Sequence, residues 1–597
     1  MLGSETADLA RLLEGHPELH ALLEHERGQW ERERASLAKH ITSLEQERDR
    51  LRASHERLRQ ELELFKRRLF IAKAERIDTR QLELEYAQKL RELDTLAGTL
   101  GLGKQPPAAD DDTPASDGKR RGKRKGNRGT GRRDLRLLPL EEERIEIADP
   151  HLEALVAAGK VIRHGFDESY KLGHKRGGRR RIVIARVRYK TVDADGDTDV
   201  ITTAMPEQML PGALAAPSLA AHVIMENIGK GMPLFRIEDG AARDGIPLDR
   251  GSLSRWKKTI GEQLAATVVK AMWEHALATA FCISTDATGV CVQPIPNDKT
   301  RQPCKKGHFL VQIADRDHIL FEYLERETST AIYARFRGFS GYVQADAKSV
   351  FNLLFADEAA MSASGHDVQH DGAERHEVAC WFHARRRFWE AAVAKQAVGR
   401  EGLMRIGRIF ELDESWKKKP PAEIRLLREA HLRPHVHAFF DWVEHTRPEF
   451  QHQRGLVRTA LEYAHNHDVA LQRFFEDGRL GLTNNWAERA NKAIATGRKA
   501  WLFCGSDDHA KSTAALFSLV SSARLHGLDP EEYLRCLIRL VPLWPSERLL
   551  ELSPLFWNRT RPRLDAKALA AELGPIAIPA EPLDTSRRPP QQQAPPD

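Results

Sequence analysis

The stretch TAFCISTDATGVCVQ, residues 279–293, places an acidic residue at the end of an apolar strand. Its first part, AFCIS, has the apolar and β-branched content of a buried strand. Asp286 follows directly, with Thr285 and Thr288 beside it. A second strand, in GYVQADAK at 341–348, ends the same way, with Asp346 after YVQA. Two strands that each lead into an aspartate predict one shared site.

The segments around these strands predict how they are arranged. KGHFLVQIADR and DHILFEYLER form a hairpin, a helix follows around 331–336, and RHEVA runs from a strand into a helix. The order is three strands, a helix, a fourth strand, a helix and a fifth strand. In a ribonuclease H-like sheet the first and fourth strands are neighbours, so Asp286 and Asp346 would converge.

A third acid, Glu488, lies in LTNNWAERANKAIATGRKAWLFCGS at 482–506. On a helix, Asn484, Glu488 and Asn491 share one face, because residues three and four apart are neighbours. The competing interpretation is a solvated helix in which Glu488 pairs with Lys492. The alternative to that ion pair is that Glu488 is a carboxylate that binds a cation.

Basic side chains flank Glu488 along this helix and are predicted to hold phosphates: Arg489, Lys492, Arg498 and Lys499. Thr483 is the predicted N-cap and Gly497 the predicted end of the helix.

Three carboxylates, Asp286, Asp346 and Glu488, suit Mg²⁺, with Mn²⁺ as a substitute, because both ions prefer oxygen ligands and bind substrate phosphates. Two such ions about 4 Å apart can activate an attacking oxygen and stabilise a leaving one. Taken singly, each acid also fits a simpler role: Asp286 as a turn residue, Asp346 as a helix cap and Glu488 as half of a surface ion pair.

The length and charge of the chain indicate several domains. It has 597 residues and a net charge of +6, which is concentrated in two basic segments. Ten of the 18 residues from Lys119 to Arg136 are Lys or Arg, and nine of the 20 from Lys171 to Lys190. Such segments are typical of proteins that bind a polyanion, most often nucleic acid.

The N-terminal segment carries a heptad register, with spacings of four and three residues between the following positions: Leu37, Ile41, Leu44, Arg48, Leu51, His55, Leu58, Leu62, Phe65 and Leu69. This pattern predicts a coiled coil, most simply a homodimer, rather than a helix packed on its own chain. The Gly-, Pro- and Lys/Arg-rich segment that follows cannot form a core, and its predicted DNA-binding residues are Arg120, Arg121, Lys123, Arg124 and Lys125.

Two small modules are predicted next. RIVIARVRYK, residues 181–190, alternates as a strand with Arg186, Arg188 and Lys190 on one face. Residues 229–264 read as helix, turn, helix, with Leu253 and Trp256 inward and Arg255, Lys257 and Lys258 outward, as in some DNA-binding modules.

The predicted fold class is a multidomain α+β protein with a ribonuclease H-like α/β catalytic core. The predicted domains are a coiled coil (1–100), a basic flexible linker (101–136), a small β-rich domain (137–205), a helical, helix-turn-helix-like region (206–270), the catalytic core in two parts (271–390 and 481–545), a helical insertion (391–480) and a partly disordered C-terminal tail (546–597).

All six cysteines lie at or after Cys282 and none are in paired spacing. Reduced thiols and no zinc are therefore expected, and the C-x-x-H pair of Cys380 and His383 is interpreted as a core cysteine with a structural or phosphate-contacting histidine. No apolar run reaches membrane-spanning length, and a cytoplasmic, nucleoid-associated location is expected.

Several blocks resemble the insertion-sequence-sixty-six family of bacterial transposases: STDATGV, GYVQADAKSVFN, VACWFHARRRFWEA, NNWAERANKAIATGRKAWLFCGS and AALFSLVSSARLHGLDPEEYL. RRLFIAKAERI and GKGMPLFRIEDGAARDGIPLDRGSLSRW resemble further blocks of the family. The resemblance implies an Asp-Asp-Glu site made by Asp286, Asp346 and Glu488. The family usually has a cysteine-rich, zinc-finger-like segment after the basic linker, and this chain departs from it there.

The leading hypothesis is a magnesium-dependent DNA transposase that cuts element ends and joins the freed 3′-hydroxyl to target DNA. The resemblance also implies small companion proteins from the same element. Two alternatives stay open: a non-catalytic DNA-binding regulator or decayed transposase, and a structure-selective nuclease of the same fold.

Overall fold

The computed structural model describes residues 17–74, 140–175, 178–192, 198–246, 248–293, 304–363 and 365–589. The chain divides into two compact units, Met1–Arg128 and Gly129–Asp597. The predicted basic linker, with Arg120 to Lys125, lies outside the described residues. None of the helices in the described ranges is both long and apolar enough to cross a membrane.

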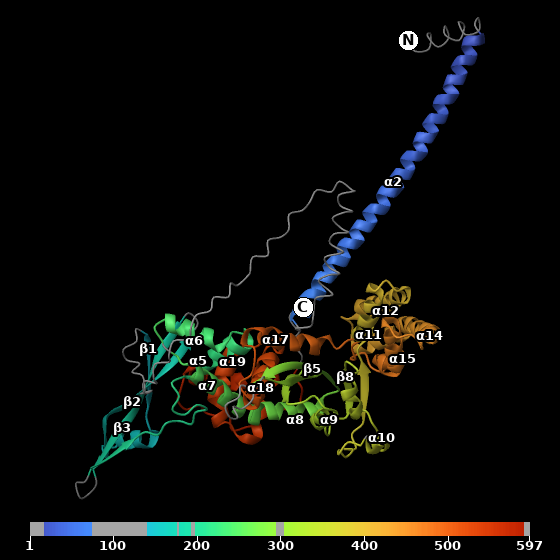
Figure 1. The fold of residues 1–597 in the computed structure, drawn as a ribbon. Helices are drawn as coiled ribbons and strands as arrows, with labels where there is room; N and C mark the ends of the chain where they lie inside the picture. The colour runs from blue at the N-terminus through green and yellow to red at the C-terminus, as the bar shows by residue number, and fades with distance from the viewer. Residues whose placement is uncertain are drawn as a thin grey trace, which may run out of the picture. The chain divides into compact units, whose positions relative to one another are not determined.

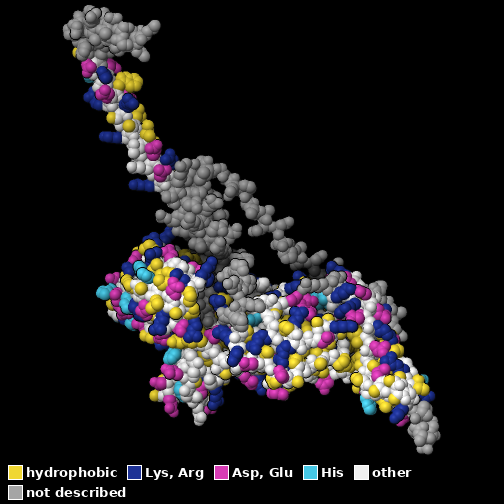
Figure 2. All heavy atoms as spheres, turned by 180° about the vertical axis from the view of Figure 1, so that it is seen from behind, with side chains coloured by type: hydrophobic (Ala, Val, Ile, Leu, Met, Phe, Trp, Pro, Cys, Tyr) yellow, Lys and Arg dark blue, Asp and Glu magenta, His cyan; other side chains and the backbone are white. Residues whose placement is uncertain are grey.

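The first unit contains one long helix, α2 (Pro17–Ala74). Three apolar positions of the predicted heptad lie on its surface: Leu37, Ile41 and Leu44 are 57%, 56% and 52% exposed. Figure 2 shows hydrophobic side chains along this helix, interspersed with charged ones. The helix itself is confirmed, and its pairing into a coiled coil stays a prediction.

The second unit begins with a small mixed sheet made of β1 (Glu141–Ile147), β2 (Val161–Lys175), β3 (Gly178–Val192) and β4 (Thr198–Thr202). β3 pairs in parallel with β1 and antiparallel with β2 and β4. Its alternation follows the prediction, since Val187 and Tyr189 are fully buried. The basic residues that alternate with them are partly exposed: Arg186, Arg188 and Lys190. Helix α4 (Pro150–Ala157) precedes β2.

Four helices connect this sheet to the larger one: α5 (Pro217–Ile224), α6 (Leu234–Arg243), α7 (Arg250–Leu264) and α8 (Lys270–Thr279). Asp249 caps α7 by accepting a hydrogen bond from Ser252 N at 2.9 Å. Leu253 and Trp256 point inward as predicted. The outward placement of Lys257 is wrong, because its ammonium donates to Asn227 Oδ1 at 2.9 Å. A DNA-binding role for α6 and α7 stays a prediction.

The larger sheet has the order β7-β6-β5-β8-β9. Its strands are β5 (Cys282–Val292), β6 (Lys305–Ala314), β7 (His318–Leu324), β8 (Gly341–Ala345) and β9 (Arg375–Ala379). The first three are antiparallel, whereas β5, β8 and β9 run parallel to one another. The predicted adjacency of first and fourth strands is confirmed, since Ile283 lies opposite Val343. Helices α9 (Ser329–Arg335) and α10 (Glu358–Ala363) lie in the connections.

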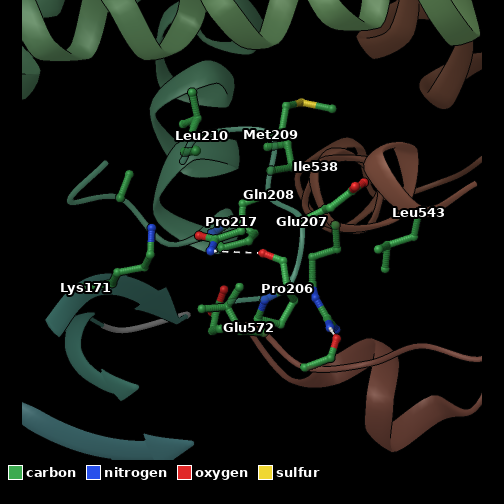
Figure 3. Close-up of a pocket in the computed structure, with 15 residues that line it drawn as sticks. Lys171, Pro206, Glu207, Gln208, Met209, Leu210, Pro217, Ile538, Leu543 and Glu572 are labelled. Carbon is green, nitrogen blue, oxygen red and sulfur yellow. Dashed lines mark hydrogen bonds between the residues drawn. The ribbon is translucent and has the colours of Figure 1, made fainter. Parts of the chain in front are cut away.

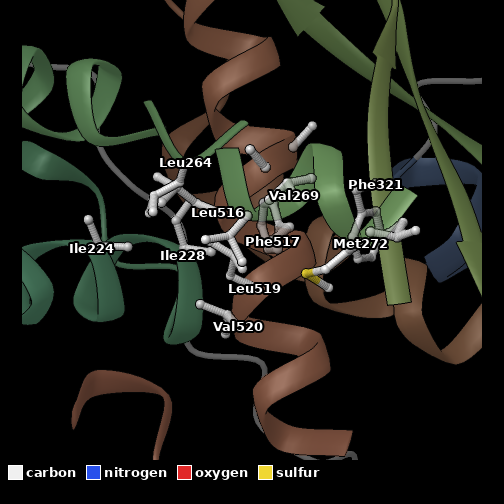
Figure 4. Close-up of a cluster of buried hydrophobic side chains, with 14 of the residues drawn as sticks. Ile224, Ile228, Leu264, Val269, Met272, Phe321, Leu516, Phe517, Leu519 and Val520 are labelled. Atoms are coloured by element: carbon white, nitrogen blue, oxygen red, sulfur yellow. The ribbon is translucent and has the colours of Figure 1, made fainter. Parts of the chain in front are cut away.

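Helix α18 (Asp507–Leu525) forms the centre of the main core. Figure 4 shows Leu516, Phe517, Leu519 and Val520 of this helix between α5–α8 and the strand that carries Phe321. Two of its serines bind the outer edge of β7: Ser518 Oγ accepts from Phe321 N at 2.7 Å, and Ser522 Oγ accepts from Ile319 N at 2.9 Å. These hydroxyls form hydrogen bonds with backbone N–H groups at the edge of β7, which would otherwise have to pair with another strand.

A second core lies beside β9, where the helices of the insertion gather (Figure 1). They are α11 (Trp381–Val393), α12 (Ala397–Trp416), α13 (Pro421–Leu427), α14 (Arg433–Phe450), α15 (Leu456–Asn466) and α16 (Asp468–Gln472). Trp381 is fully buried against Phe439 and donates from Nε1 to Leu471 O at 2.7 Å. Residues 391–480 carry helices and no strand.

The C-terminal segment packs on α5 and α18 and reaches the small sheet at Glu572 and Leu573. It contains α19 (Pro530–Leu540), α20 (Pro554–Thr560) and α21 (Ala566–Ala570). Buried Glu572 accepts hydrogen bonds from Arg180 at 2.8 Å and from Ser218 N at 3.1 Å. Figure 3 shows the cavity of about 20 Å³ that Glu572 and Lys171 help to line, with space for about one water molecule. Residues 590–597 lie outside the described residues, so the predicted disorder there stays a prediction.

Candidate active site

Asp286 lies within β5 rather than in a turn after it. It is opposite Val311 of β6, and β5 continues to Val292. The alternation of the strand buries Ile283 and Thr285 and leaves the Asp286 carboxylate on the other face, 20% exposed. Thr285 Oγ1 donates to Val311 O at 2.9 Å, which fixes the strand at this point. The strand therefore holds Asp286 rigidly.

Asp346 follows β8 directly, and its side chain is only 9% exposed. The next residue, Ala347, has φ of +54°, a left-handed conformation that costs about 1–2 kcal/mol for a residue with a Cβ. This turn brings the Lys348 ammonium to 3.0 Å from Asp346 Oδ2. Non-glycine residues with strained backbone cluster at functional sites, which makes the Asp346–Lys348 turn a candidate for one.

Glu488 comes from α17 (Asn485–Trp501), a helix that differs from its predicted ends. Asn484 takes the N-cap position rather than Thr483, without a side-chain capping bond. The helix also runs through Gly497, which was predicted to end it. A Cβ built on Gly497 would lie 2.7 Å from Trp501 Nε1, so the glycine leaves room for this indole; a Cβ built on Gly231 would in turn lie 3.2 Å from the Gly497 Cα.

Hydrogen bonds from two asparagines join α17 to β5. Asn484 Nδ2 donates to Thr285 O at 2.6 Å, and Asn491 Nδ2 donates to Asp286 Oδ2 at 2.9 Å. Glu488 lies between them on the same face of the helix, so these two bonds direct its carboxylate towards the aspartates. The pKa of Glu488 is raised, first by burial and then by the negative charge of Asp286 and Asp346.

Asp286 and Asp346 both lie beside the ammonium of Lys348. This ammonium lies 4.0 Å from Asp286 Oδ1 and 3.7 Å from Oε1 of a further acid, Glu327. Although burial acts against it, Asp346 and Glu327 raise the pKa of Lys348 above its ordinary value. Glu327 was missed by sequence reasoning, since it sits in the connection between β7 and α9 with no motif around it.

The donor set fits a hard divalent cation. Asp346 Oδ1 and Glu327 Oε1 are buried and have no hydrogen-bond donor among the described residues. Buried carboxylate oxygens require a hydrogen-bond donor or a cation. The single positive charge of Lys348 does not balance the negative charges of Asp286, Asp346 and Glu327. Oxygen ligands in this number are those that Mg²⁺ and Mn²⁺ prefer.

His383 lies at the start of α11, and its Nε2 is 3.9 Å from Glu488 Oε1. Burial lowers its pKa, while Asp346 and Asp286 act in the opposite direction. Cys380 is fully buried, its Sγ accepts a hydrogen bond from Asn484 N at 3.3 Å, and burial raises its pKa to about 11. The C-x-x-H pair therefore belongs to this site, with Cys380 as a packing residue and His383 beside the third acid.

The basic residues of α17 fall into two groups. Arg498 donates to Thr288 Oγ1 at 3.1 Å and to Gly289 O at 2.5 Å, so it helps to hold the helix on β5. Arg489 and Lys492 are exposed and, with Glu488, line an open hollow of about 470 Å³. Lys499 is also exposed. Of the three acids, Glu488 is the one that lines this hollow.

The simpler roles considered for the three acids do not match the structure. Asp286 is inside a strand, and Asp346 caps no helix, since the short 3₁₀ helix that follows it begins at Ser349. No ion pair joins Glu488 to Lys492 in the described part of the chain, where His383 Nε2 lies 3.9 Å from Glu488 Oε1.

Comparison with known proteins identifies the family. A family model described as "Transposase IS66 family" matches residues 212–512, about half of the chain, including Asp286, Asp346 and Glu488. The chain belongs to the IS66 family of transposases. The match leaves out the long helix α2, the small sheet and the C-terminal segment.

Relatives of this IS66 family member occur in Sinorhizobium fredii. The protein y4qI is 25% identical over 433 residues, which cover 70% of this chain and 76% of y4qI. The protein y4jD is 24% identical over 470 residues, which cover 75% of this chain and 86% of y4jD. Both are named as uncharacterized proteins, so they add no residue roles to this transposase.

Proposed function

We propose that this protein cuts the ends of its insertion sequence and joins the freed 3′-hydroxyls to target DNA at a site formed by Asp286, Asp346 and Glu488. The observation that carries the proposal is the convergence of Asp286 of β5 and Asp346 after β8 on the Lys348 ammonium, with Glu488 of α17 near enough for both aspartates to raise its pKa. Membership of a transposase family supports the same activity.

Asp286, Asp346 and Glu488 would hold Mg²⁺, with Mn²⁺ as a substitute. The bound cation supplies Lewis-acid activation of the attacking oxygen and charge stabilisation of the leaving one. Asn491 orients Asp286 through its 2.9 Å hydrogen bond, and Asn484 sets the start of the helix that carries Glu488. Glu327 adds negative charge at the edge of the site.

DNA is the proposed partner. Arg489, Lys492 and Lys499 are the side chains of α17 that would contact phosphates, because they are exposed on the helix of Glu488. Arg498 is assigned to holding α17 in place, since its guanidinium already donates to β5. The basic linker would add sequence-independent affinity.

The test is a strand-transfer assay with the full-length protein, Mg²⁺ and labelled DNA that carries the ends of the encoding element. The proposal expects cutting at the ends followed by covalent joining to a second DNA. Cutting without joining would favour a structure-selective nuclease. Binding without either reaction would favour a regulator or a decayed copy. If companion proteins are required, adding them restores activity that the chain alone lacks.

A further inference from the structure

Two large apolar side chains lie on the surface at the end of α17, the helix that carries Glu488. Leu502 is 61% exposed and Phe503 is 44% exposed, and they directly follow the last residue of the helix, Trp501. Single exposed apolar side chains are common on protein surfaces and need no explanation. This pair is different because of the backbone that holds it.

Leu502 has a strained backbone conformation. Its φ is +67° and its ψ is −47°, and Phe503 N donates a hydrogen bond to Trp501 O at 2.8 Å. These angles and this hydrogen bond define a γ-turn with positive φ, a rare and strained conformation that glycine adopts more easily than leucine. Non-glycine residues under such strain cluster at functional sites, and they persist only where the surrounding structure holds them.

Hydrogen bonds fix the chain on both sides of this γ-turn. Before it, the Arg498 guanidinium donates to Thr288 Oγ1 at 3.1 Å. After it, Cys504 is buried, and its backbone N donates to Cys291 O at 2.9 Å. Thr288 and Cys291 both belong to β5, the strand of Asp286. The turn is therefore held at a fixed place relative to that acid.

An exposed basic row leads from Glu488 to the turn. Lys492 follows Glu488 by four residues and Lys499 follows Lys492 by seven, which places all three on one side of α17. Leu502 comes 14 residues after Glu488, and at about 1.5 Å per residue this is about 21 Å along the helix. DNA that lies along this row with its cut phosphate at the acids would reach the turn about six base pairs away, since base pairs are about 3.4 Å apart.

We propose that Leu502 and Phe503 form an apolar wedge that enters one base step of the bound element end and unstacks it, about six base pairs from the cut phosphate. Leucine and phenylalanine side chains of other DNA-binding proteins part base steps in this way. Lys499, three residues before Leu502, favours a nucleic acid as the occupant, because its charge complements phosphate.

The wedge rests on the proposed DNA transposase function and adds the place where the duplex is deformed. The backbone strain at Leu502 has a use in this setting, since it holds the side chain out from the protein before DNA arrives. The anchors on β5 would keep the wedge and Asp286 in register on the same DNA end.

The experiment uses the full-length protein in chelator, so that the DNA stays uncut. The probes are duplexes with the end of the encoding element in which one base at a time is replaced by 2-aminopurine, a fluorescent base that brightens when it loses its stacking neighbours. The proposal expects a rise of at least about threefold at one step, roughly five to seven base pairs from the cut site, and little change elsewhere. Leu502→Gly and Phe503→Ser should each reduce this rise, and the double variant should abolish it.

Two controls separate the wedge from general damage. Leu502→Gly should keep or raise the melting temperature, because glycine relieves the strain of the positive φ. Leu426→Ser, at an exposed position of α13, should keep the wild-type fluorescence rise.

Mobility shifts with the same duplexes separate the wedge from the proposed function. Binding without a fluorescence rise at any position, or a rise that survives the double variant, would overturn the wedge and leave DNA binding in place. No binding to the element end would overturn both. A double variant that changes mass in light scattering but keeps the fluorescence rise would assign the pair to a contact with a second copy of the chain, and the wedge would be wrong.

Discussion

Asn491 Nδ2 donates a hydrogen bond of 2.9 Å to Asp286 Oδ2, and this bond joins the helix of the third acid to the strand of the first. Asn491 is buried and lies almost one helical turn after Glu488. The position of the Glu488 carboxylate therefore depends on the same hydrogen bond that orients Asp286.

Replacing Asn491 with Ala should lower strand cleavage by roughly 10- to 100-fold, because a misplacement of about 1 Å in a catalytic group can cost that much. The free energy of unfolding should fall by about 1–2 kcal/mol through the lost hydrogen bond. Cleavage rates at saturating Mg²⁺ and the melting temperature measure the two effects. Asn466→Ala in α15 is the control, since Asn466 makes no side-chain hydrogen bond within the described residues. Wild-type cleavage by Asn491→Ala would remove Asn491 from the site.

Asp286→Asn, Asp346→Asn and Glu488→Gln should each abolish cleavage and joining by several orders of magnitude and leave end-binding nearly unchanged. The amides preserve shape but lose the charge that would hold the cation. Glu488→Gln should not lower the melting temperature, because its raised pKa shows that the folded protein disfavours the ionised carboxylate. Glu411→Gln, at an exposed position of α12, is the control. If Glu488→Gln cuts and joins at the wild-type rate, Glu488 is not the third ligand.

Lys348→Met should make the structure more dependent on added cation. Without the ammonium, Asp286, Asp346 and Glu327 repel one another, so the melting temperature in chelator should fall by about 3 °C. Mg²⁺ should then raise the melting temperature of Lys348→Met more than that of wild type, because a cation bound only by the folded state stabilises it. Lys511→Met on α18 is the control, with an exposed lysine. Equal Mg²⁺ responses in wild type and Lys348→Met would contradict this assignment.

Asp371 stabilises the segment that leads into β9. It accepts hydrogen bonds from Gly338 N at 2.8 Å and Tyr333 Oη at 3.0 Å, and pairs with fully buried Arg375. Although burial acts to raise it, these bonds lower the pKa of Asp371 to about 2. A carboxyl whose pKa is lower in the folded state stabilises the protein above its ordinary pKa of about 4, and the stability is lost as pH falls towards 2.

Asp371→Asn should therefore destabilise the protein by about 3 kcal/mol at neutral pH, since it leaves the Arg375 charge without its partner. The difference in melting temperature between wild type and variant should shrink as pH falls from 4 towards 2. Asp367→Asn, on the same connection and exposed, is the matched control. A difference that stays constant from pH 7 to pH 2 would mean that the charge of Asp371 is not what stabilises this region.

The strand arrangement could be predicted because it depends on local pattern and order. The apolar content of 279–285 and 341–345 marked two strands, and the order of elements placed them side by side, as Ile283 opposite Val343 shows. The common face of Asn484, Glu488 and Asn491 followed from helical spacing in the same way.

Contacts that depend on the path of the chain could not be predicted. Glu327 reaches Lys348 only because the β6–β7 hairpin returns its end to the site. Lys257 reads as an exposed basic residue but points to Asn227, since α7 packs against the core. Gly497 reads as a helix end, whereas α17 continues past it and its Cα lies so close to Gly231 that a Cβ on Gly231 would come within 3.2 Å. None of these partners is near in sequence.

The exposed apolar row of α2 leads to the last prediction. Leu37, Ile41 and Leu44 are each more than half exposed in the described structure, although a 58-residue helix of this composition gains most of its stability from packing. Burying each of them against a partner helix would contribute about 1.5–3 kcal/mol. We therefore expect the protein to be an oligomer, most simply a dimer, held through this row.

Replacing Leu37, Ile41 and Leu44 together with Ser should convert the oligomer to a monomer in light scattering and abolish simultaneous binding of two DNA ends, because the heptad contacts are lost. The control replaces Glu45 and Glu47, which are exposed on the same helix, with Gln and should keep the wild-type mass. Binding to a single end should survive in the Ser variant, since the second unit, which holds Arg489, Lys492 and Lys499, is unchanged. A wild-type protein that is monomeric at all concentrations, or a Ser variant with the wild-type mass, would show that α2 is not the oligomer contact.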